Sequence, residues 1–275
     1  MGLAPRRSLA RISREAIEGA GRGDEILFFD RSGFTTSPGV ATLFWLGDQL
    51  QSWDEYDRIK TAVVGLLSGG VSGFSLLHSD AGGYVTLDFT VDGRNVPVLA
   101  RSPELLMRWM ELNAFTAVFR THEGLDPAAA AQFDTSAATL EQLLRFAKVY
   151  RGLGPYRRGL VAETAALGHP VAEAAALGHP VAEAAALGHP VVRHPFLHYP
   201  EDANTFGLRY QFLLGPDLMV APVLDPGVGL GRGLLSRGQR LDRPLERRCR
   251  RRAGAWRSMP APLGRPAAFL RSDAA

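Results

Sequence analysis

The sequence has little cysteine, almost no lysine and no long hydrophobic run, and the first and last of these gaps each exclude a class of protein. The single cysteine, Cys249, leaves no disulfide framework and no thiolate cluster for zinc or an iron–sulfur centre, and it fits a reducing compartment. No run approaches the roughly 18 apolar residues of a membrane-spanning helix. No apolar segment follows the arginines of MGLAPRRSLARIS. We therefore expect a cytoplasmic protein that is neither secreted nor bound to a membrane.

The basic residues are almost all arginine, and they are unevenly placed. Lysine occurs only at Lys60 and Lys148. Residues 228–257 hold ten arginines against the two acids Asp242 and Glu246, so this segment alone outweighs the formal net charge of +3. The arginine bias indicates a GC-rich gene. The hydrophobic content of 46% is enough for a sizeable core, in one large domain or in one domain and part of another.

Four apolar runs are predicted to be buried strands. None shows the alternation of a half-exposed strand, which favours parallel strands covered on both faces. The runs are EILFF (25–29), TLFWLG (42–47), VSGFSLL (71–77) and AFTAVF (114–119). The expected helices are residues 13–20, 52–68 and 102–113. Ser52 and Ser102 are the expected N-caps, and the alternation of helices with buried strands predicts an α/β fold.

A polar cluster follows each of the four predicted strands. The clusters are Asp30-Arg31, Gly47-Asp48, His78-Ser79-Asp80 and Arg120-Thr121-His122-Glu123. In parallel α/β folds the carboxyl ends of the strands form the functional site. One polar cluster is more often simply the end of a strand, but four clusters that each contain a charged side chain favour a shared pocket.

Residues 161–190 are three near-copies of a ten-residue unit, VAETAALGHP, VAEAAALGHP and VAEAAALGHP. The period is too short for a familiar solenoid, and Gly-His-Pro interrupts each short Ala-rich helix. A metal array formed by His169, His179 and His189 is one alternative. No carboxylate or thiolate accompanies each histidine at ligand spacing. We therefore expect a duplicated linker and no metal site.

The arginine-rich segment GRGLLSRGQRLDRPLERRCRRRAGAWRS, residues 231–258, has two interpretations. Clustered arginines could neutralise the phosphates of a nucleic acid. However, Trp256 is the only aromatic side chain available for stacking on bases, and no known binding module surrounds it. We favour a stretch read in a shifted frame from GC-rich DNA, and we expect no nucleic-acid partner.

Five longer motifs are specific enough to compare with a known family. They are FFDRSGF, FWLGDQ, HSDAGGY, ELLMRWMELNAFTAVFRTHEG and GHPVVRHPFLHYPEDANTFGLRYQFLLGPDLMVAPVLDPG. Together they resemble glycoside hydrolase family 31, and within it the bacterial sulfoquinovosidases. The resemblance covers roughly residues 13–227, apart from the extra repeat copies, and resumes at residues 259–271. Gln49 and the ending THEG distinguish the chain from many α-glucosidases of this family.

The resemblance implies the second half of a catalytic (β/α)8 TIM barrel in residues 1–160 and the end of that barrel, with a partial β-sandwich-like domain, in residues 191–275. The triplicated linker at 161–190 lies between them. The family usually has one copy of the unit, so two copies look like an expansion, and His194 replaces a leucine of the family motif. Residues 228–258 are expected to be out of frame, because the family continues here into a strand-rich domain.

The resemblance also implies a retaining α-glycoside hydrolase. Such enzymes use two carboxyl groups about 5–5.5 Å apart, one as nucleophile and one as general acid/base. Asp48 matches the general acid/base. As an alternative, Asp48 could simply cap the following helix, but Ser52 is better placed for that role.

The sugar subsite of the family is expected to comprise five side chains of this chain. Arg31 is expected to orient the acid, Asp80 and His122 to bind ring hydroxyls, and Trp45 to supply an apolar wall, although a buried tryptophan is more often plain core. Tyr84 matches a position near the sulfonate group of a sulfoquinovoside. No cofactor is implied.

The nucleophile of the family is an aspartate at the end of the fourth barrel strand, and it is expected to be absent from this chain. Asp24, Asp30 and Asp54 are available carboxylates, but none matches its motif. The sequence therefore predicts a C-terminal fragment of an enzyme that cleaves α-sulfoquinovosides, inactive alone and prone to self-association through exposed barrel edges. A neutral α-glucosidase, a non-catalytic sugar-binding remnant and an arginine-rich nucleic-acid binder are the alternatives.

Overall fold

The computed structural model describes most of the 275-residue chain. The described residues are 4–23, 25–34, 37–87, 90–91, 94–95, 99–166, 189–235, 240–242, 251–252 and 255–271. Asp24, His169, His179 and most of the repeat lie outside these ranges, as does much of the arginine-rich segment. The predictions made for them therefore remain predictions.

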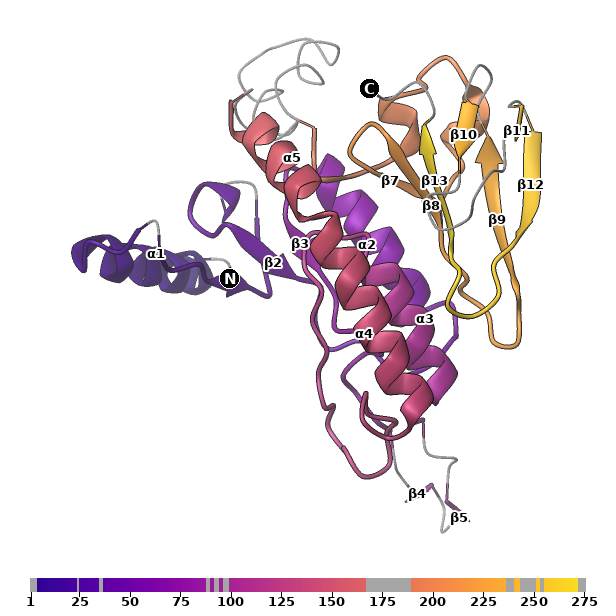
Figure 1. Ribbon diagram of the computed structural model, residues 1–275. Helices are drawn as coiled ribbons and strands as arrows, with labels where there is room; N and C mark the ends of the chain where they lie inside the picture. The colour runs from indigo at the N-terminus through magenta and orange to yellow at the C-terminus, as the bar shows by residue number, and fades with distance from the viewer. Residues whose placement is uncertain are drawn as a thin grey trace.

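The first part of the chain contains a three-stranded parallel sheet with α2 packed beside β3 (Figure 1). Its strands are β1 (Phe29–Asp30), β2 (Leu43–Trp45) and β3 (Leu77–His78), in that order. Its helices are α1 (Ala4–Gly19), α2 (Ile59–Val71), α3 (Pro103–Asn113), α4 (Ala137–Gly152) and α5 (Gly154–Ala166), with a short 3-10 turn η1 (Ser37–Gly39). The short strands β4 (Thr90–Val91) and β5 (Arg94–Asn95) form a separate antiparallel pair.

Several of the expected boundaries differ from the structure. Helix α1 begins at Ala4 and not at residue 13, and β1 spans only Phe29–Asp30 of the run expected at 25–29, with Phe29 43% exposed where a buried strand was predicted. Helix α2 begins at Ile59 with Arg58 as its N-cap, so the prediction of Ser52 as a cap is wrong. The backbone turns before the helix, where the amide of Leu50 donates to the carbonyl of Asp57 (2.8 Å) and Asp57 has a positive φ of 52°. The predicted strand 71–77 begins too early, because Val71 still belongs to α2.

The start of α3 follows the prediction from sequence. The hydroxyl of Ser102 accepts a hydrogen bond from the amide of Leu105 (3.2 Å), and Pro103 occupies the first helical position. After α3 the predicted strand 114–119 contains no assigned strand. Its continuation at Thr121 nevertheless forms an isolated parallel bridge with Ala81, next to β3. The fourth predicted run therefore still ends beside the other three.

The second part of the chain is antiparallel and rich in strands. One sheet has the order β11-β10-β13-β8-β7-β6, and β9 pairs with β12. These strands are β6 (Val192–Arg193), β7 (Phe212–Leu214), β8 (Leu218–Ala221), β9 (Leu230–Leu235), β10 (Arg240–Asp242), β11 (Arg251–Arg252), β12 (Ala255–Pro260) and β13 (Ala267–Arg271). The 3-10 turns η2 (Pro195–Leu197) and η3 (Ala203–Thr205) lie between β6 and β7.

One hydrophobic core joins the two parts. It runs from Leu66 and Trp109 of the helices to Phe212 and Val220 of the strands. A buried carboxylate adds a polar connection, because Glu111 accepts hydrogen bonds from Arg108, Gln142 and the backbone amide of Gly264. The helical layer is therefore fixed to the strand-rich part. Among the described residues, no helix is long and apolar enough to cross a membrane.

Candidate active site

The carboxyl ends of the parallel strands bring the predicted site residues to one edge of the sheet. Arg31 directly follows β1, Asp48 comes three residues after β2, and Asp80 comes two residues after β3. The bridge between Ala81 and Thr121 places His122 beside them. Parallel strands direct their carboxyl ends to the same edge, which is why residues far apart in sequence meet here.

Asp48 and Arg31 form an ion pair across β1 and β2. Nη1 of Arg31 lies 2.8 Å from Oδ2 of Asp48, and the side chain of Asp48 is 27% exposed. Gly47 precedes the acid with φ of +98°, a conformation in which a side chain would be strained. Asp48 is thus held at the surface of the site, where an incoming ligand can reach it.

Asp80 is buried, with 1% of its surface exposed, and only one of its oxygens is fully paired. Oδ1 accepts from Nε of Arg120 (2.8 Å) and forms an ion pair with Nη2 of the same side chain (2.5 Å). Oδ2 has no hydrogen-bond partner of good geometry among the described residues, although the nearby Trp45 side chain helps to stabilise the charged form. Burial raises the pKa of Asp80, and Arg120 opposes this shift. Oδ2 is therefore a buried acceptor beside Trp45.

Trp45 lies between two cations. The guanidinium of Arg31 is 5.4 Å from the centre of the Trp45 ring, and that of Arg120 is 5.5 Å away. Arg120 also lies 5.2 Å from the ring of Phe29. These contacts place two guanidinium groups around a half-buried aromatic wall. Each guanidinium is also paired with a carboxylate, Arg31 with Asp48 and Arg120 with Asp80, so the wall is bordered by polar groups of both signs.

His122 and Tyr84 form the opposite side of the site. Their rings meet edge to face with centroids 4.8 Å apart. Nδ1 of His122 accepts a hydrogen bond from the amide of Gly124 (3.1 Å), which leaves Nε2 to carry the proton in the neutral ring. Nε2 of His122 can then donate a hydrogen bond to a ligand.

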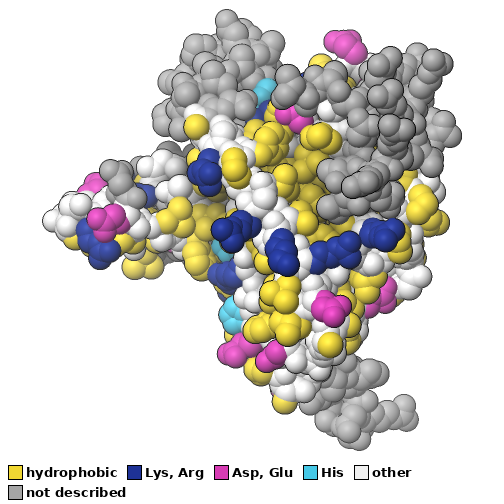
Figure 2. Space-filling view, viewed as in Figure 1, with side chains coloured by type: hydrophobic (Ala, Val, Ile, Leu, Met, Phe, Trp, Pro, Cys, Tyr) yellow, Lys and Arg dark blue, Asp and Glu magenta, His cyan; other side chains and the backbone are white. Residues whose placement is uncertain are grey.

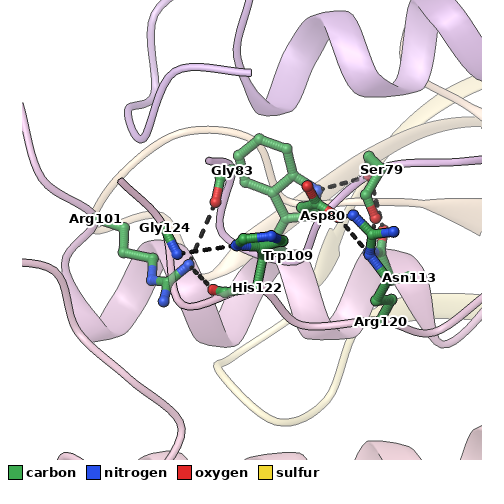
Figure 3. Close-up of polar contacts among 9 residues, drawn as sticks. All are labelled: Ser79, Asp80, Gly83, Arg101, Trp109, Asn113, Arg120, His122 and Gly124. Atoms are coloured by element: carbon green, nitrogen blue, oxygen red, sulfur yellow. Dashed lines mark hydrogen bonds and ion pairs between the residues drawn. The ribbon is translucent and has the colours of Figure 1, made fainter. Parts of the chain in front are cut away.

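Helix α3 supports the loop that carries Asp80 (Figure 3). The indole of Trp109 donates to the hydroxyl of Ser79 (3.0 Å), and that hydroxyl donates to the side-chain oxygen of Asn113 (3.1 Å). The side-chain amide nitrogen of Asn113 donates in turn to the backbone carbonyl of Ser79 (2.9 Å). All three side chains are buried, so the residue before Asp80 is rigidly held.

Sequence reasoning missed several residues of the site. Arg120 belongs to the polar cluster after the fourth predicted run, but its pairing with Asp80 was not expected. His78 is buried beside Phe29, and its pKa is lowered to about 4, chiefly by burial and secondly by the charge of Arg120. The buried Gln49 has a side-chain oxygen without a partner among the described residues. Arg120 and His78 could have been predicted as site residues, because both are polar residues of the strand-end clusters.

The remaining carboxylates lie around this cluster. Burial raises the pKa of Asp30. Asp54 is exposed and forms an ion pair with Arg58. Burial also raises the pKa of Asp57, and the negative charge of Asp48 adds a smaller effect in the same direction. In the described part of the chain, no group of three His, Cys, Asp or Glu residues is arranged to hold a metal ion.

Comparison with known protein families agrees with this arrangement. The model of the glycosyl hydrolases family 31 TIM-barrel domain matches residues 7–156, and that of the glycosyl hydrolase family 31 C-terminal domain matches residues 188–273. The chain belongs to glycoside hydrolase family 31. The predicted family and the predicted α/β barrel architecture, followed by a β-rich domain, are confirmed.

Within family 31 the chain is similar to proteins named sulfoquinovosidase. It is 37% identical to the one from Escherichia coli over 264 residues, which is 96% of this chain and 34% of the relative. It is 35% identical to the one from Agrobacterium fabrum, over 96% of this chain and 35% of the relative. The chain therefore spans about a third of the length of these relatives.

A solved structure gives the same comparison in three dimensions. It is a family 31 sulfoquinovosidase from E. rectale, in complex with an aza-sugar inhibitor. The TM-score is 0.80 at 30% sequence identity, and the match covers 98% of this chain and 36% of the other. Fold and sequence therefore indicate the same group of relatives.

Proposed function

We propose that this chain supplies the general acid/base and much of the sugar subsite of a retaining α-glycosidase that cleaves α-sulfoquinovosides. The single observation that carries this proposal is the ion pair of Arg31 and Asp48, 2.8 Å apart, at the same strand edge as Asp80 and His122. The names of the relatives favour the sulfoquinovoside over the neutral α-glucoside.

Asp48 acts on the glycosidic bond in two steps. It first donates its proton to the oxygen of the leaving group, and it then removes a proton from the water that attacks the glycosyl-enzyme. Its partial exposure supports this role, because both the leaving group and the water must reach it. Arg31 holds one carboxylate oxygen and leaves the other, Oδ1, to face the substrate.

The sugar is held by groups that already lack partners or point into the site. Oδ2 of Asp80 accepts a hydrogen bond from a ring hydroxyl, and Nε2 of His122 donates one. Trp45 supplies the apolar wall. The guanidinium groups of Arg31 and Arg120 flank Trp45. Tyr84 contacts the sulfonate through water.

We infer that the nucleophile is a carboxylate outside this set of residues. Asp54 is engaged with Arg58, and Asp30 lies at the end of β1 without the sequence motif of the family nucleophile. Without a nucleophile no glycosyl-enzyme can form, so the chain by itself should not turn over substrate.

We further propose that copies of the chain associate through the surface around α1 and β1. Large apolar side chains are exposed there, namely Leu9, Ile12, Leu27, Phe29 and Phe34. Figure 2 shows hydrophobic side chains reaching the surface where the α1 arm joins the body. Among the described strands, β1 pairs only with β2, and an unpaired parallel edge favours association.

The proposed function is tested with an aryl α-sulfoquinovoside, first on the chain alone and then on a chimera in which the part of a sulfoquinovosidase relative that precedes the matched region is joined to its N-terminus. We expect no turnover by the chain and measurable turnover by the chimera. An aryl α-glucoside run in parallel tests the alternative substrate, and a faster reaction with it would contradict the sulfoquinovoside assignment. A chimera that binds the sugar but never cleaves either substrate would favour the non-catalytic remnant.

A further inference from the structure

A buried positive charge lies directly behind the candidate site. Arg101 is 3% exposed, yet none of the ion pairs in the described part of the chain involves it. Its guanidinium donates instead to the backbone carbonyls of Ala131 (2.5 Å), His122 (2.6 Å) and Glu123 (3.0 Å), and at longer range to that of Gly83 (3.3 Å). The side-chain oxygen of Gln132 accepts a further bond at 2.7 Å.

This arrangement is an unusual way to stabilise a fold. Burying a charged group carries a large desolvation cost, and an apolar side chain of similar size is often as stable or more stable at such a position. Burial lowers the pKa of Arg101 to about 10, with only partial compensation from the charge of Asp80. The guanidinium is therefore better explained by what its five donors connect than by a gain in stability.

The donors of Arg101 connect the loops that carry the sugar-binding side chains. Gly83 precedes Tyr84, and the carbonyl of His122 belongs to the predicted sugar-binding histidine itself. The backbone amide of Arg101 also donates to the side-chain oxygen of Gln51 (3.0 Å). The side-chain nitrogen of Gln51 donates in turn to the carbonyl of Tyr84 (3.3 Å). Figure 3 shows the guanidinium between Gly83 and His122. The loops after β2, β3 and the fourth run thus share one support.

Two glycines make this close approach possible. Gly82 has φ of +90°, and a Cβ there would lie 2.7 Å from Cδ of Arg101. Gly124 has φ of +91°, and a Cβ there would lie 2.5 Å from Nε2 of Gln51. A side chain at either position would push the loops away from the network. The local backbone is accordingly shaped around Arg101 and its partners.

We propose that Arg101 is a positioning residue that fixes the Tyr84 loop and the His122 loop at the spacing needed to grip one sugar. The sugar-binding part of this statement rests on the proposed function. Arg101 contacts no substrate, so its effect passes through the carbonyls of Gly83, His122 and Glu123.

The experiment compares Arg101→Lys with Arg108→Lys in the full chain. Arg108 is a matched control, because it is also 3% exposed and its guanidinium bonds, to Glu111 and to the carbonyl of Val228, lie outside the site. Hydrogen exchange is followed by mass spectrometry, and the ring nitrogens of His122 are followed by NMR with labelled histidine. We expect Arg101→Lys to speed exchange of the Gly124 amide region about tenfold or more and to shift the Nδ1 signal of His122. Arg108→Lys should change neither.

The proposal is overturned if Arg101→Lys leaves both signals as in the wild type, or if Arg108→Lys changes them equally. If Arg101→Lys does not fold, Gln132→Leu provides a milder variant, because Gln132 accepts from Arg101 and donates to the carbonyl of Glu123 (2.8 Å). It should speed exchange at the same loop by about threefold, and an unchanged rate would sink the proposal.

These readouts are taken without sugar, so they judge Arg101 separately from the proposed function. Methyl α-sulfoquinovoside is then added to the wild type as the probe. Protection of the two loops supports the sugar subsite, and Arg101→Lys should then need about tenfold more sugar for the same protection. If the wild type shows no protection, the proposed function is contradicted, while the sugar-free measurements still decide whether Arg101 fixes the two loops.

Discussion

Lowering the pH should leave His78 uncharged until about pH 4. The pKa of this ring is lowered from 6.5 to about 4, with burial as the larger cause and the charge of Arg120 as the second. At 1.36 kcal/mol for each pKa unit, this shift corresponds to a preference of about 3 kcal/mol for the neutral ring in the folded chain. An NMR titration of the histidine rings measures it directly, with His78 assigned from a His78→Gln variant. A midpoint near 6.5 in the folded chain would refute the reasoning.

The order of the two causes gives a second measurement on the same ring. Arg120→Gln removes the positive charge but leaves the burial, so the pKa of His78 should rise but stay below 6.5. A complete return to 6.5 in Arg120→Gln would show that the charge, and not burial, dominates.

The sign of the effect on stability follows from the lowered pKa. The folded pKa lies below the unfolded value, so the contribution of neutral His78 is fully present above about pH 6.5 and is lost as the pH falls toward 4. Urea unfolding in dilute solution should show that the wild type loses about 2–3 kcal/mol more than His78→Gln between about pH 7.5 and about pH 4.5. Equal losses in the two proteins would contradict the assignment of this acid sensitivity to His78.

Three further changes test other parts of the site. In the chimera, Asp48→Asn should keep sugar binding and lower the rate of hydrolysis by roughly 10²–10⁴-fold. The loss should be smaller for leaving groups that need little protonation. An unchanged rate on alkyl glycosides would contradict the assignment of Asp48 as general acid/base. Gly83→Ala should destabilise the chain by about 1–3 kcal/mol in thermal unfolding, because φ is +76° and a Cβ would lie 2.8 Å from the carbonyl of Gln49. Trp109→Phe should expose the amides around Asp80 to faster hydrogen exchange, because the bond to Ser79 is lost.

Elements whose causes are local could be predicted from the amino-acid sequence. Helix α3 is predicted at 102–113 and spans Pro103–Asn113, because its cap, its proline and its apolar positions all lie within a few residues. The strand-end clusters are also visible in the sequence, since a charged residue directly after an apolar run marks where burial stops. Together with the five longer motifs, these local signals were enough to predict the family and the barrel architecture.

Features that depend on distant partners could not be predicted in this way. Helix α2 begins at Ile59 and not after Ser52, because the preceding loop is held by Val85, whose carbonyl accepts from the amide of Gln51 (3.1 Å). Asp80 meets Arg120 forty residues away along the chain. Arg101 reads in the sequence as an ordinary residue before a helix cap, and only the folded loops reveal that it is buried among their carbonyls. Pairings of this kind depend on how the strand ends pack, which no short stretch of sequence contains.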